Sequence, residues 1–385
     1  MVSPESESVP VEAAGPASSP STLHTLHVAD RDFFARFGRM FRHVALGLNT
    51  EGVRVALLTD DPVAAADLDA TPVVCAGVEP LSGWRAWRLP TRVERRLNWP
   101  PDVVHLWTTR GLGAWSDWAR ARGIPVVVHA FSARDVQQLA ARRPRAGMHL
   151  LAGSAGLVQL ARDGWPWLVE HLRVAPPAFL MPPAPSVATR APTERTAGIL
   201  WTGRVDAQAG LEVLIDALAQ LRRSTHDVQA ALIGVGPGVR ATWKKIHAAG
   251  VQDRVTLIHE VRAWDQAMHG VEVCVVPTRQ QELSLAPLLA MALGKVVICA
   301  RGQIAEWFIE DQTTWQFTPG SAVELACQLS RACEGERPPR ELGRSAAAYV
   351  REHFTLGRLV AQLLAVYRTA HSAPPRRTTE EVSPS

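Results

Sequence analysis

The 385-residue sequence lacks any apolar run near the ~18 residues that a membrane-spanning helix needs. Its five cysteines are an odd number and do not have the spacing of metal ligands. Cys274 and Cys299 lie inside apolar segments, where cysteine usually acts as a small buried hydrophobic residue. We therefore expect reduced thiols and a cytoplasmic protein.

A strong charge of one sign is also absent. The chain has 41 basic and 37 acidic residues, a net charge of +4, and its basic residues occur only in short runs such as residues 142–145. This balance suits an anionic ligand such as a nucleotide phosphate, but it is not typical of nucleic-acid binding. The length and the hydrophobic fraction of 47% indicate a globular protein with two domains, each with its own core.

The two ends of the chain have little that could form a core. Residues 1–22 and 371–385 are rich in Ser, Pro, Thr and Glu, and the first of them lacks the basic region and apolar core of a secretory signal. We expect both to be disordered tails. Six prolines fall between Pro176 and Pro192, and residues 181–197 are expected to form a linker.

Apolar segments alternate with helical patterns on both sides of this linker. Strands are expected over residues 25–29, 54–59, 102–107, 125–129 and 149–152 in the first half, and 198–202, 229–233, 255–258, 271–276 and 297–300 in the second. Such alternation predicts a parallel, doubly wound α/β sheet in each half. We expect Rossmann-like domains at residues 23–180 and 198–345, followed by a C-terminal helix at residues 346–370.

Residues 277–302, PTRQQELSLAPLLAMALGKVVICARG, carry the most informative motif. An apolar strand ends, a polar loop and a helix follow, and the chain turns at Gly294 into another strand. In such a crossover the loop lies at the carboxyl end of its strand, where open α/β sheets bind ligands. The motif resembles the donor-sugar loop of family 4 (group 1) glycosyltransferases, whose GT-B fold has two Rossmann-like domains facing across a cleft. Leu289 stands where that family has one glutamate, and its other glutamate falls on Gln281, beside Glu282.

The resemblance implies metal-independent, retaining transfer of a hexosyl group from a nucleotide diphosphate sugar, with no cofactor and with a carbohydrate or lipid-linked acceptor. It implies that Arg204, at the end of a strand, holds the donor diphosphate. Glu306, with Gln281 or Glu282, would orient the donor sugar, since this route needs no protein nucleophile. The family's lysine five residues after the arginine is Ala209 here, and Leu289 cannot accept hydrogen bonds from ribose hydroxyls.

In the first half, the family's glycine-rich loop is reduced to Gly38, which the resemblance places at the donor phosphate. Arg36 and Arg39 could supply the charge missing at Ala209, or could be solvated arginines of an amphipathic helix. His129 ends a strand and resembles the family's histidine near the acceptor, where it could relay a proton; a structural histidine is the alternative.

The glycines of residues 234–238, Gly-Val-Gly-Pro-Gly, are expected to form a turn with positive φ between a strand and a helix. This turn is weak support for a ligand.

These residues leave more than one function open. The first is an active transferase; the alternative is a catalytically degenerate binding or scaffolding protein on the same fold, because two donor-binding residues are replaced. An epimerase of nucleotide sugars is a third class, and it would need more acid and base residues than the sequence offers.

Overall fold

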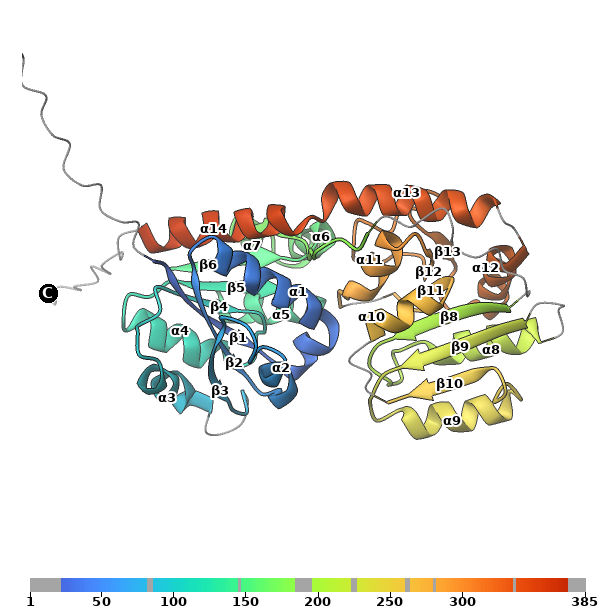
Figure 1. Cartoon of the computed structure of the whole chain (residues 1–385), viewed down its shortest axis with the longest axis horizontal. Coiled ribbons are helices and arrows are strands. Elements are labelled where there is room, and N and C mark those ends of the chain that lie inside the picture. The colour runs from blue at the N-terminus through green and yellow to red at the C-terminus, as the bar shows by residue number, and fades with distance from the viewer. Residues whose placement is uncertain are drawn as a thin grey trace, which may run out of the picture.

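The structure is a computed structural model, and it describes residues 22–81, 86–144, 147–183, 196–222, 227–259, 264–279, 282–334 and 337–372. Two α/β units lie side by side, and two long helices at the end of the chain run along both of them (Figure 1). Gln281, most of the two expected tails and most of the expected linker lie outside the described residues.

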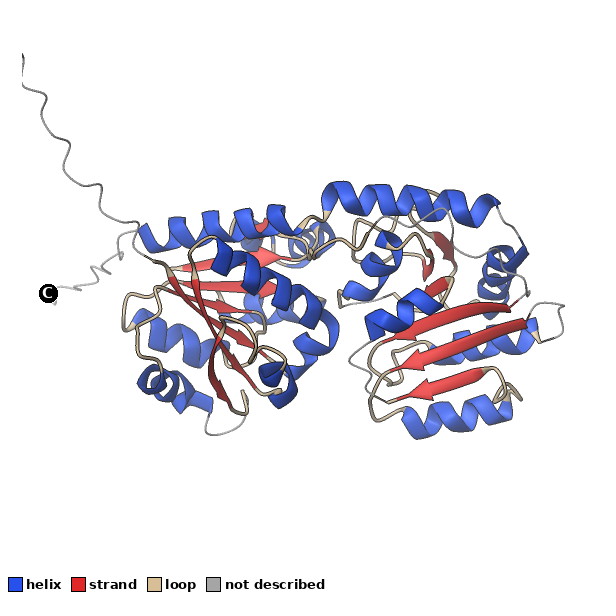
Figure 2. Cartoon of the chain, viewed as in Figure 1, coloured by secondary structure: helices blue, strands red, loops and turns tan. Residues whose placement is uncertain are grey.

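A parallel sheet in the order β3-β2-β1-β4-β5-β6-β7 forms the first unit. Every residue of its central strands β4 and β5 is buried, as expected for a parallel sheet that helices cover on both faces (Figure 2). Its strands are β1 (His24–Ala29), β2 (Arg54–Thr59), β3 (Val74–Val78), β4 (Val103–Leu106), β5 (Val126–Ala130), β6 (Met148–Ala152) and β7 (Leu172–Val174). Its helices are α1 (Arg31–Thr50), α2 (Pro62–Ala66), η1 (Ala86–Arg88), α3 (Leu89–Arg96), α4 (Leu112–Arg120), α5 (Ala133–Arg142), α6 (Ala155–Gly164) and α7 (Pro166–Val169).

The second unit repeats this plan with the strand order β10-β9-β8-β11-β12-β13. In both sheets the strand order reverses beside the first strand, and this switch point is where open α/β sheets form a ligand crevice. The predicted fold of two Rossmann-like units is therefore confirmed. The strands are β8 (Thr196–Thr202), β9 (Asp227–Ile233), β10 (Val255–Ile258), β11 (Val273–Val276), β12 (Val296–Ala300) and β13 (Trp315–Phe317). The helices are α8 (Leu211–Leu221), α9 (Val239–Ala248), α10 (Trp264–Ala267), η2 (Met268–Gly270), α11 (Leu285–Ala292) and α12 (Ala322–Glu334).

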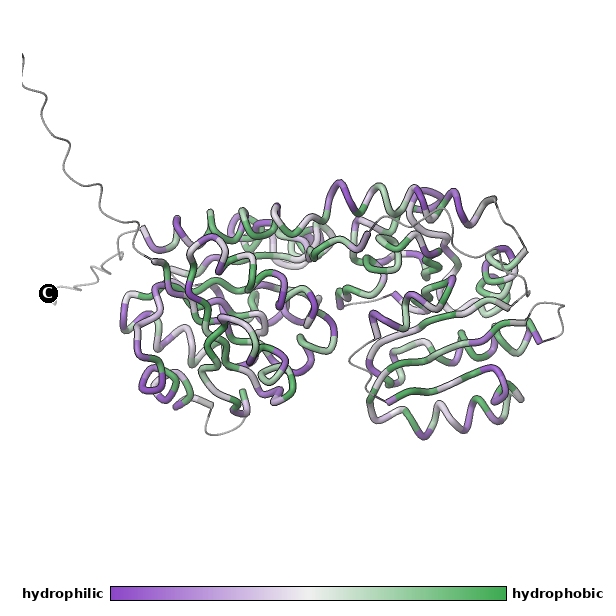
Figure 3. The backbone as a smooth tube through the Cα atoms, viewed as in Figure 1, coloured by the Kyte–Doolittle hydropathy of each residue, from purple (hydrophilic) through white to green (hydrophobic). Residues whose placement is uncertain are grey.

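The two units share one apolar core. The buried cluster of the first unit, which includes Phe33, Phe37 and Trp107, continues into the second through helix α11, all of whose residues are buried. Helix α11 contacts α1 of the first unit as well as α13, β11 and β12. A separate cluster covers the other face of the second sheet. The hydropathy colouring shows these apolar segments running through the interior of both units (Figure 3).

The chain ends in two helices rather than in the single helix expected over residues 346–370. Helix α13 (Arg337–His353) packs on α11, and α14 (Leu356–Ser372) packs on α1 and β4 of the first unit. Between them, Thr355 forms a parallel bridge with Phe179, so its backbone pairs with an extended segment instead of continuing the helix. None of the described helices is both long and apolar enough to cross a membrane.

Close backbone approach, and not positive φ, explains the glycines of residues 234–238. Gly238 has a φ of −81°, and neither Gly234 nor Gly236 is in the left-handed region, so that prediction is wrong. A Cβ atom at Gly234 would collide with the carbonyl oxygen of Gly203, and one at Gly236 with that of Val205. The glycines therefore let the loops after β8 and β9 touch.

Three histidines are fully buried under helix α14: His27, His105 and His129. The His105 Nδ1 atom lies 2.5 Å from the hydroxyl oxygen of Tyr367 on α14, and the His129 Nε2 atom lies 2.8 Å from the carbonyl oxygen of Ala175. Burial lowers the pKa of His27 and His129 to about 3 and lowers the pKa of His105 well below its usual range. All three rings are therefore neutral in the folded protein near pH 7.

We expect the free energy of unfolding to fall as the pH drops below about 6.5, the ordinary pKa of histidine. The folded-state pKa values are lowered, so the unfolded chain takes up protons that the folded chain cannot, and this stability is present above pH 6.5. At pH 5, His27 and His129 should each contribute a loss of about 2 kcal/mol. Urea unfolding at pH 7.5 and pH 5 measures the difference, and equal stabilities would contradict the prediction.

Candidate functional site

The candidate site lies where loops at the carboxyl ends of the two sheets meet. The Leu283 N–H, after β11, donates to the carbonyl oxygen of Phe131, after β5, at 2.7 Å. The Ser154 hydroxyl, after β6, donates to the carbonyl oxygen of Ile304, after β12, at 3.1 Å. The carboxyl ends of β5 and β6 are therefore held close to those of β11 and β12.

Arg204 lies two residues beyond the end of β8. Its side chain is 63% exposed, and its Nε–H donates to the Asp206 carboxylate at 3.1 Å. The next residue, Val205, is fully buried and donates its N–H to the carbonyl oxygen of Val235, so the guanidinium projects from a fixed backbone. Gly210, which precedes helix α8, has a φ of 69°, and a Cβ atom there would collide with Thr278. This close approach sets the Arg204 loop beside the loop that follows β11.

The described part of that second loop next to α11, residues 282–284, is called the donor loop below. Leu283 is only 2% exposed, whereas the side chain of Glu282 is 55% exposed. The Arg36 Nη1–H donates to the carbonyl oxygen of Leu283 at 3.1 Å, and the same atom lies 3.8 Å from the Glu282 carboxylate. Ser284 begins α11 by accepting the N–H of Ala286 with its side-chain oxygen. The donor loop is thus bound from both domains.

Glu306, in the loop after β12, reaches the first domain. One of its carboxylate oxygens accepts the N–H of Ala155, the first residue of α6, at 2.9 Å, where the helix dipole favours a negative charge. Part of Glu306 stays exposed, yet the surrounding atoms crowd the carboxylate and raise its pKa, and the N–H groups of Ala155 and Gly156 offset part of that rise. A Cβ atom at Gly156 would collide with the carbonyl oxygen of Ile304, so glycine allows this contact.

Gly38 lies inside helix α1 and not in a loop. The helix begins directly after β1 because the Asp30 side chain accepts the N–H of Phe33 at 2.8 Å and caps it. The two arginines on either side of Gly38 are neither solvated nor free for a phosphate: Arg36 holds the donor loop, and the Arg39 Nη1–H donates to Asp265 of α10 at 2.7 Å. The side chains of Arg36 and Arg39 therefore bind the second domain.

His129 does not lie at the surface of the cleft. Its ring is fully buried, stacks against Phe131 and Trp107, and keeps a pKa of about 3. Because helices cover both faces of the sheet, the side chain before the end of β5 points into the core. This placement is that of a structural histidine.

The charged cluster around Arg110, at the switch point of the first sheet, was not predicted from the sequence. Arg110, after β4, pairs with Asp30 and Asp32 after β1 and with Asp60 after β2. Burial raises the pKa of Asp60. Each of these residues follows a buried strand by one to four positions, which is the signal that could have identified them.

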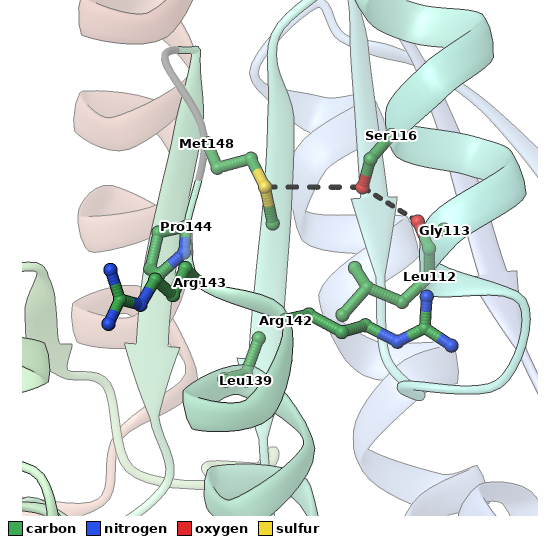
Figure 4. A pocket seen from close by; sticks show the side chains of 8 residues that line it. All are labelled: Leu112, Gly113, Ser116, Leu139, Arg142, Arg143, Pro144 and Met148. Atoms are coloured by element: carbon green, nitrogen blue, oxygen red, sulfur yellow. Dashed lines mark hydrogen bonds between the residues drawn. The ribbon is translucent and has the colours of Figure 1, made fainter.

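Leu289, the residue in the place of the family's second glutamate, is fully buried in α11. A cavity of about 70 Å³ lies elsewhere, beside α4 and α5 in the first domain; the side chains of Leu112, Arg142 and Met148 are among those that line it (Figure 4). None of the cleft residues above lines this cavity. Among the described residues, no group of three or more His, Cys, Asp or Glu side chains is placed to hold a metal ion.

Part of the sequence matches a known family. Residues 196–335 match the model of the glycosyl transferases group 1. Over 176 residues the chain is 29% identical to an alpha-D-kanosaminyltransferase of Streptomyces kanamyceticus; the aligned region covers 44% of this chain and 45% of that protein. Over 214 residues it is 29% identical to a D-inositol 3-phosphate glycosyltransferase of Arthrobacter sp. (strain FB24), covering 52% and 51%. The chain thus spans about half the length of the curated relatives it matches.

Solved structures share the two-domain fold over nearly the whole chain. HepE of Anabaena, crystallised with UDP-glucose, has a TM-score of 0.74 at 16% identity, covering 90% of this chain and 100% of that chain. Sucrose-phosphate synthase of Thermosynechococcus elongatus has a TM-score of 0.73 at 17% identity, covering 91% and 100%. These structures show that the fold is GT-B. The roles of Arg204, Glu282, Glu306, Gly38 and the undescribed Gln281 stay predictions.

Replacing Gly38 with alanine tests whether this glycine serves a ligand. A Cβ atom there would lie 3.7 Å from Phe34, an ordinary contact, so Gly38→Ala should raise the free energy of unfolding by about 0.5–1 kcal/mol. Gly47→Ala is the matched control in the same helix, since its Cβ would lie 2.8 Å from Val360 of α14 and should destabilise. Urea denaturation measures both, and a destabilised Gly38→Ala would contradict the open placement of Gly38. A stable variant with weaker donor binding would support a role at the donor phosphate.

Proposed function

We propose that the protein transfers a hexosyl group from a nucleotide diphosphate sugar to an acceptor hydroxyl, because residues 196–335 match the model of the glycosyl transferases group 1 and the fold is GT-B. We further propose that the transfer retains the anomeric configuration and needs no metal. The observation that carries the proposal is the exposed guanidinium of Arg204 on a fixed backbone at the switch point of the second sheet. This is the place where an open α/β sheet binds its ligand.

Arg204 would bind the donor diphosphate. A guanidinium offers parallel N–H donors that match phosphate oxygens, and it keeps its charge at all working pH values. That charge would stabilise the diphosphate as it leaves the sugar. Ala209 supplies no charge. The N-terminus of helix α8, which begins directly after Gly210, would instead offer the positive end of its helix dipole to the diphosphate.

Glu282 and Glu306 would orient the hydroxyls of the donor sugar, with Gln281 beside them. Each carboxylate has about four acceptor positions, so the contact of Glu306 with Ala155 leaves room for a sugar hydroxyl. In retaining transfer without a protein nucleophile, the acceptor oxygen attacks the anomeric carbon on the face from which the diphosphate leaves. The sugar–phosphate bond breaks, the new glycosidic bond forms, and the acceptor proton passes to a phosphate oxygen. We assign no proton transfer to the buried His129.

Arg204→Ala tests the proposal. Calorimetric titration with UDP-, GDP- and ADP-glucose at millimolar concentration should give heat for at least one donor, and the variant should weaken its affinity about tenfold or more, as expected for a charged hydrogen bond. Because Arg204 is largely exposed, the Arg204→Ala variant should have the same melting temperature as the unaltered protein. Lys244→Ala, an exposed cation of α9, is the control and should bind as the unaltered chain does. No heat from the unaltered chain with any donor would remove the transferase proposal.

One observation favours the second candidate, a binding protein without transferase activity. Leu289 has no exposed surface, and the whole of α11 around it is buried, so its side chain is not accessible to ribose hydroxyls. On this alternative the fold would hold a partner without turning over a nucleotide sugar.

Leu289→Glu tests whether the space around position 289 is filled. A buried, unpaired carboxylate should cost several kcal/mol, so we expect a large loss of melting temperature. Leu289→Met, with a similar volume, is the control and should cost less than about 1.5 kcal/mol. A large loss for the glutamate variant alone shows that the position is filled, and the calorimetric titration with the donors then decides between the transferase and the binding protein. A small change together with tighter donor binding would contradict the filled site.

A further inference from the structure

Helix α1 of the first domain reaches across the cleft and holds the donor loop of the second. Arg36 donates from Nη1 to the carbonyl oxygen of Leu283 and lies 3.8 Å from the carboxylate of Glu282. Its side chain is 22% exposed, which is much less than the 63% of Arg204. One guanidinium therefore contacts both the backbone and the neighbouring carboxylate of the donor loop.

Both backbone polar groups of Leu283 are bound by the first domain. Its N–H donates to Phe131 and its carbonyl oxygen accepts from Arg36, while Glu282 and Ser132 form an antiparallel bridge. The Leu283 side chain is buried as well. A Cβ atom at Gly153 would lie 2.8 Å from both Leu283 and Phe131, so the glycine makes room for the docked leucine.

We propose that Arg36 is a positioning residue that places Glu282 at the donor sugar only when the two domains are closed. With the domains apart, Leu283 would lose both backbone partners, and the donor loop would have no group from the first domain to fix it. Closure would therefore complete the donor site, which couples sugar contact to domain closure. Arg39 with Asp265 forms a second tether from the same helix face, three residues further along α1.

The consequence for transfer rests on the proposed function. The contact of Arg36 with the donor loop, called the clamp below, can be tested without a donor. In Arg36→Ala, hydrogen exchange at the Leu283 amide should be about tenfold faster, as expected when a supporting hydrogen bond is lost. Exchange in strands β5 and β11 should not change. The matched control is Arg42→Ala in the same helix, since Arg42 donates to Asp67 of its own domain. Arg42→Ala should leave the Leu283 amide unchanged.

Arg36→Lys keeps the charge and one donor group, and it should restore part of the protection at Leu283. Equal exchange at Leu283 in Arg36→Ala and in the unaltered chain would overturn the proposal, as would an equal increase in Arg42→Ala. If Arg36→Ala fails to fold, amides in the whole chain will exchange rapidly. In that case, exchange at the donor loop in Arg36→Lys and in Leu283→Ala decides whether the clamp exists. Faster exchange confined to the donor loop supports the clamp, and unchanged exchange in both refutes it.

With the donor that calorimetry identifies, Arg36→Ala should lower kcat about tenfold, a loss as large as that of one hydrogen bond made only in the closed state, and Arg36→Lys should recover part of it. The acceptor KM should change little. A change in acceptor KM alone would contradict a role in positioning Glu282. If no donor binds at all, the proposed function fails, while the exchange result still decides whether Arg36 clamps the donor loop.

Discussion

The burial of helix α11 is the constraint on which the rest of the structure depends. The helix lies against β11 and β12 of its own domain, against α13, and against α1 of the first domain, and none of its residues reaches the surface. The apolar core of the first domain therefore continues into the second. Because the donor loop leads directly into α11, the packing of both domains sets its position, and the proposed sugar site depends on both domains.

Several polar groups in the loops at the strand ends form hydrogen bonds between the two domains. Glu306 binds the N-terminus of α6, Ser154 binds the loop after β12, and Arg36 binds the donor loop. Buried or half-buried polar groups need such partners, so on the proposed function a bound donor would exchange contacts within the protein for contacts with itself. Arg204 differs because its guanidinium pairs with Asp206 of the same loop and remains largely exposed. It is therefore the group from which donor binding can begin with the least rearrangement.

The sequence predicted the central strands well because buried parallel strands are continuous apolar runs. The expected strands 102–107 and 125–129 overlap the central strands β4 and β5, whereas β3, β7 and β13 were not predicted. These three short strands are edge strands, and β3 and β7 are partly exposed. The capping residue Asp30 was a readable sign that Gly38 lies in a helix. The contacts of Arg36 could not be predicted, because they join positions 247 residues apart and depend on how the domains pack.

The two departures from the pattern of the resembling family, at Ala209 and Leu289, have different physical consequences. At Ala209 a positive charge is missing from a loop, and a neighbouring cation or helix end can replace its effect at a distance. At Leu289 a carboxylate is replaced by a side chain that belongs to the shared core. A glutamate there would need a partner for its buried charge, whereas leucine lets α11 pack closely between the domains. Closer packing of the domains and a carboxylate for the ribose are thus competing uses of one position, and in this chain the position contributes to packing.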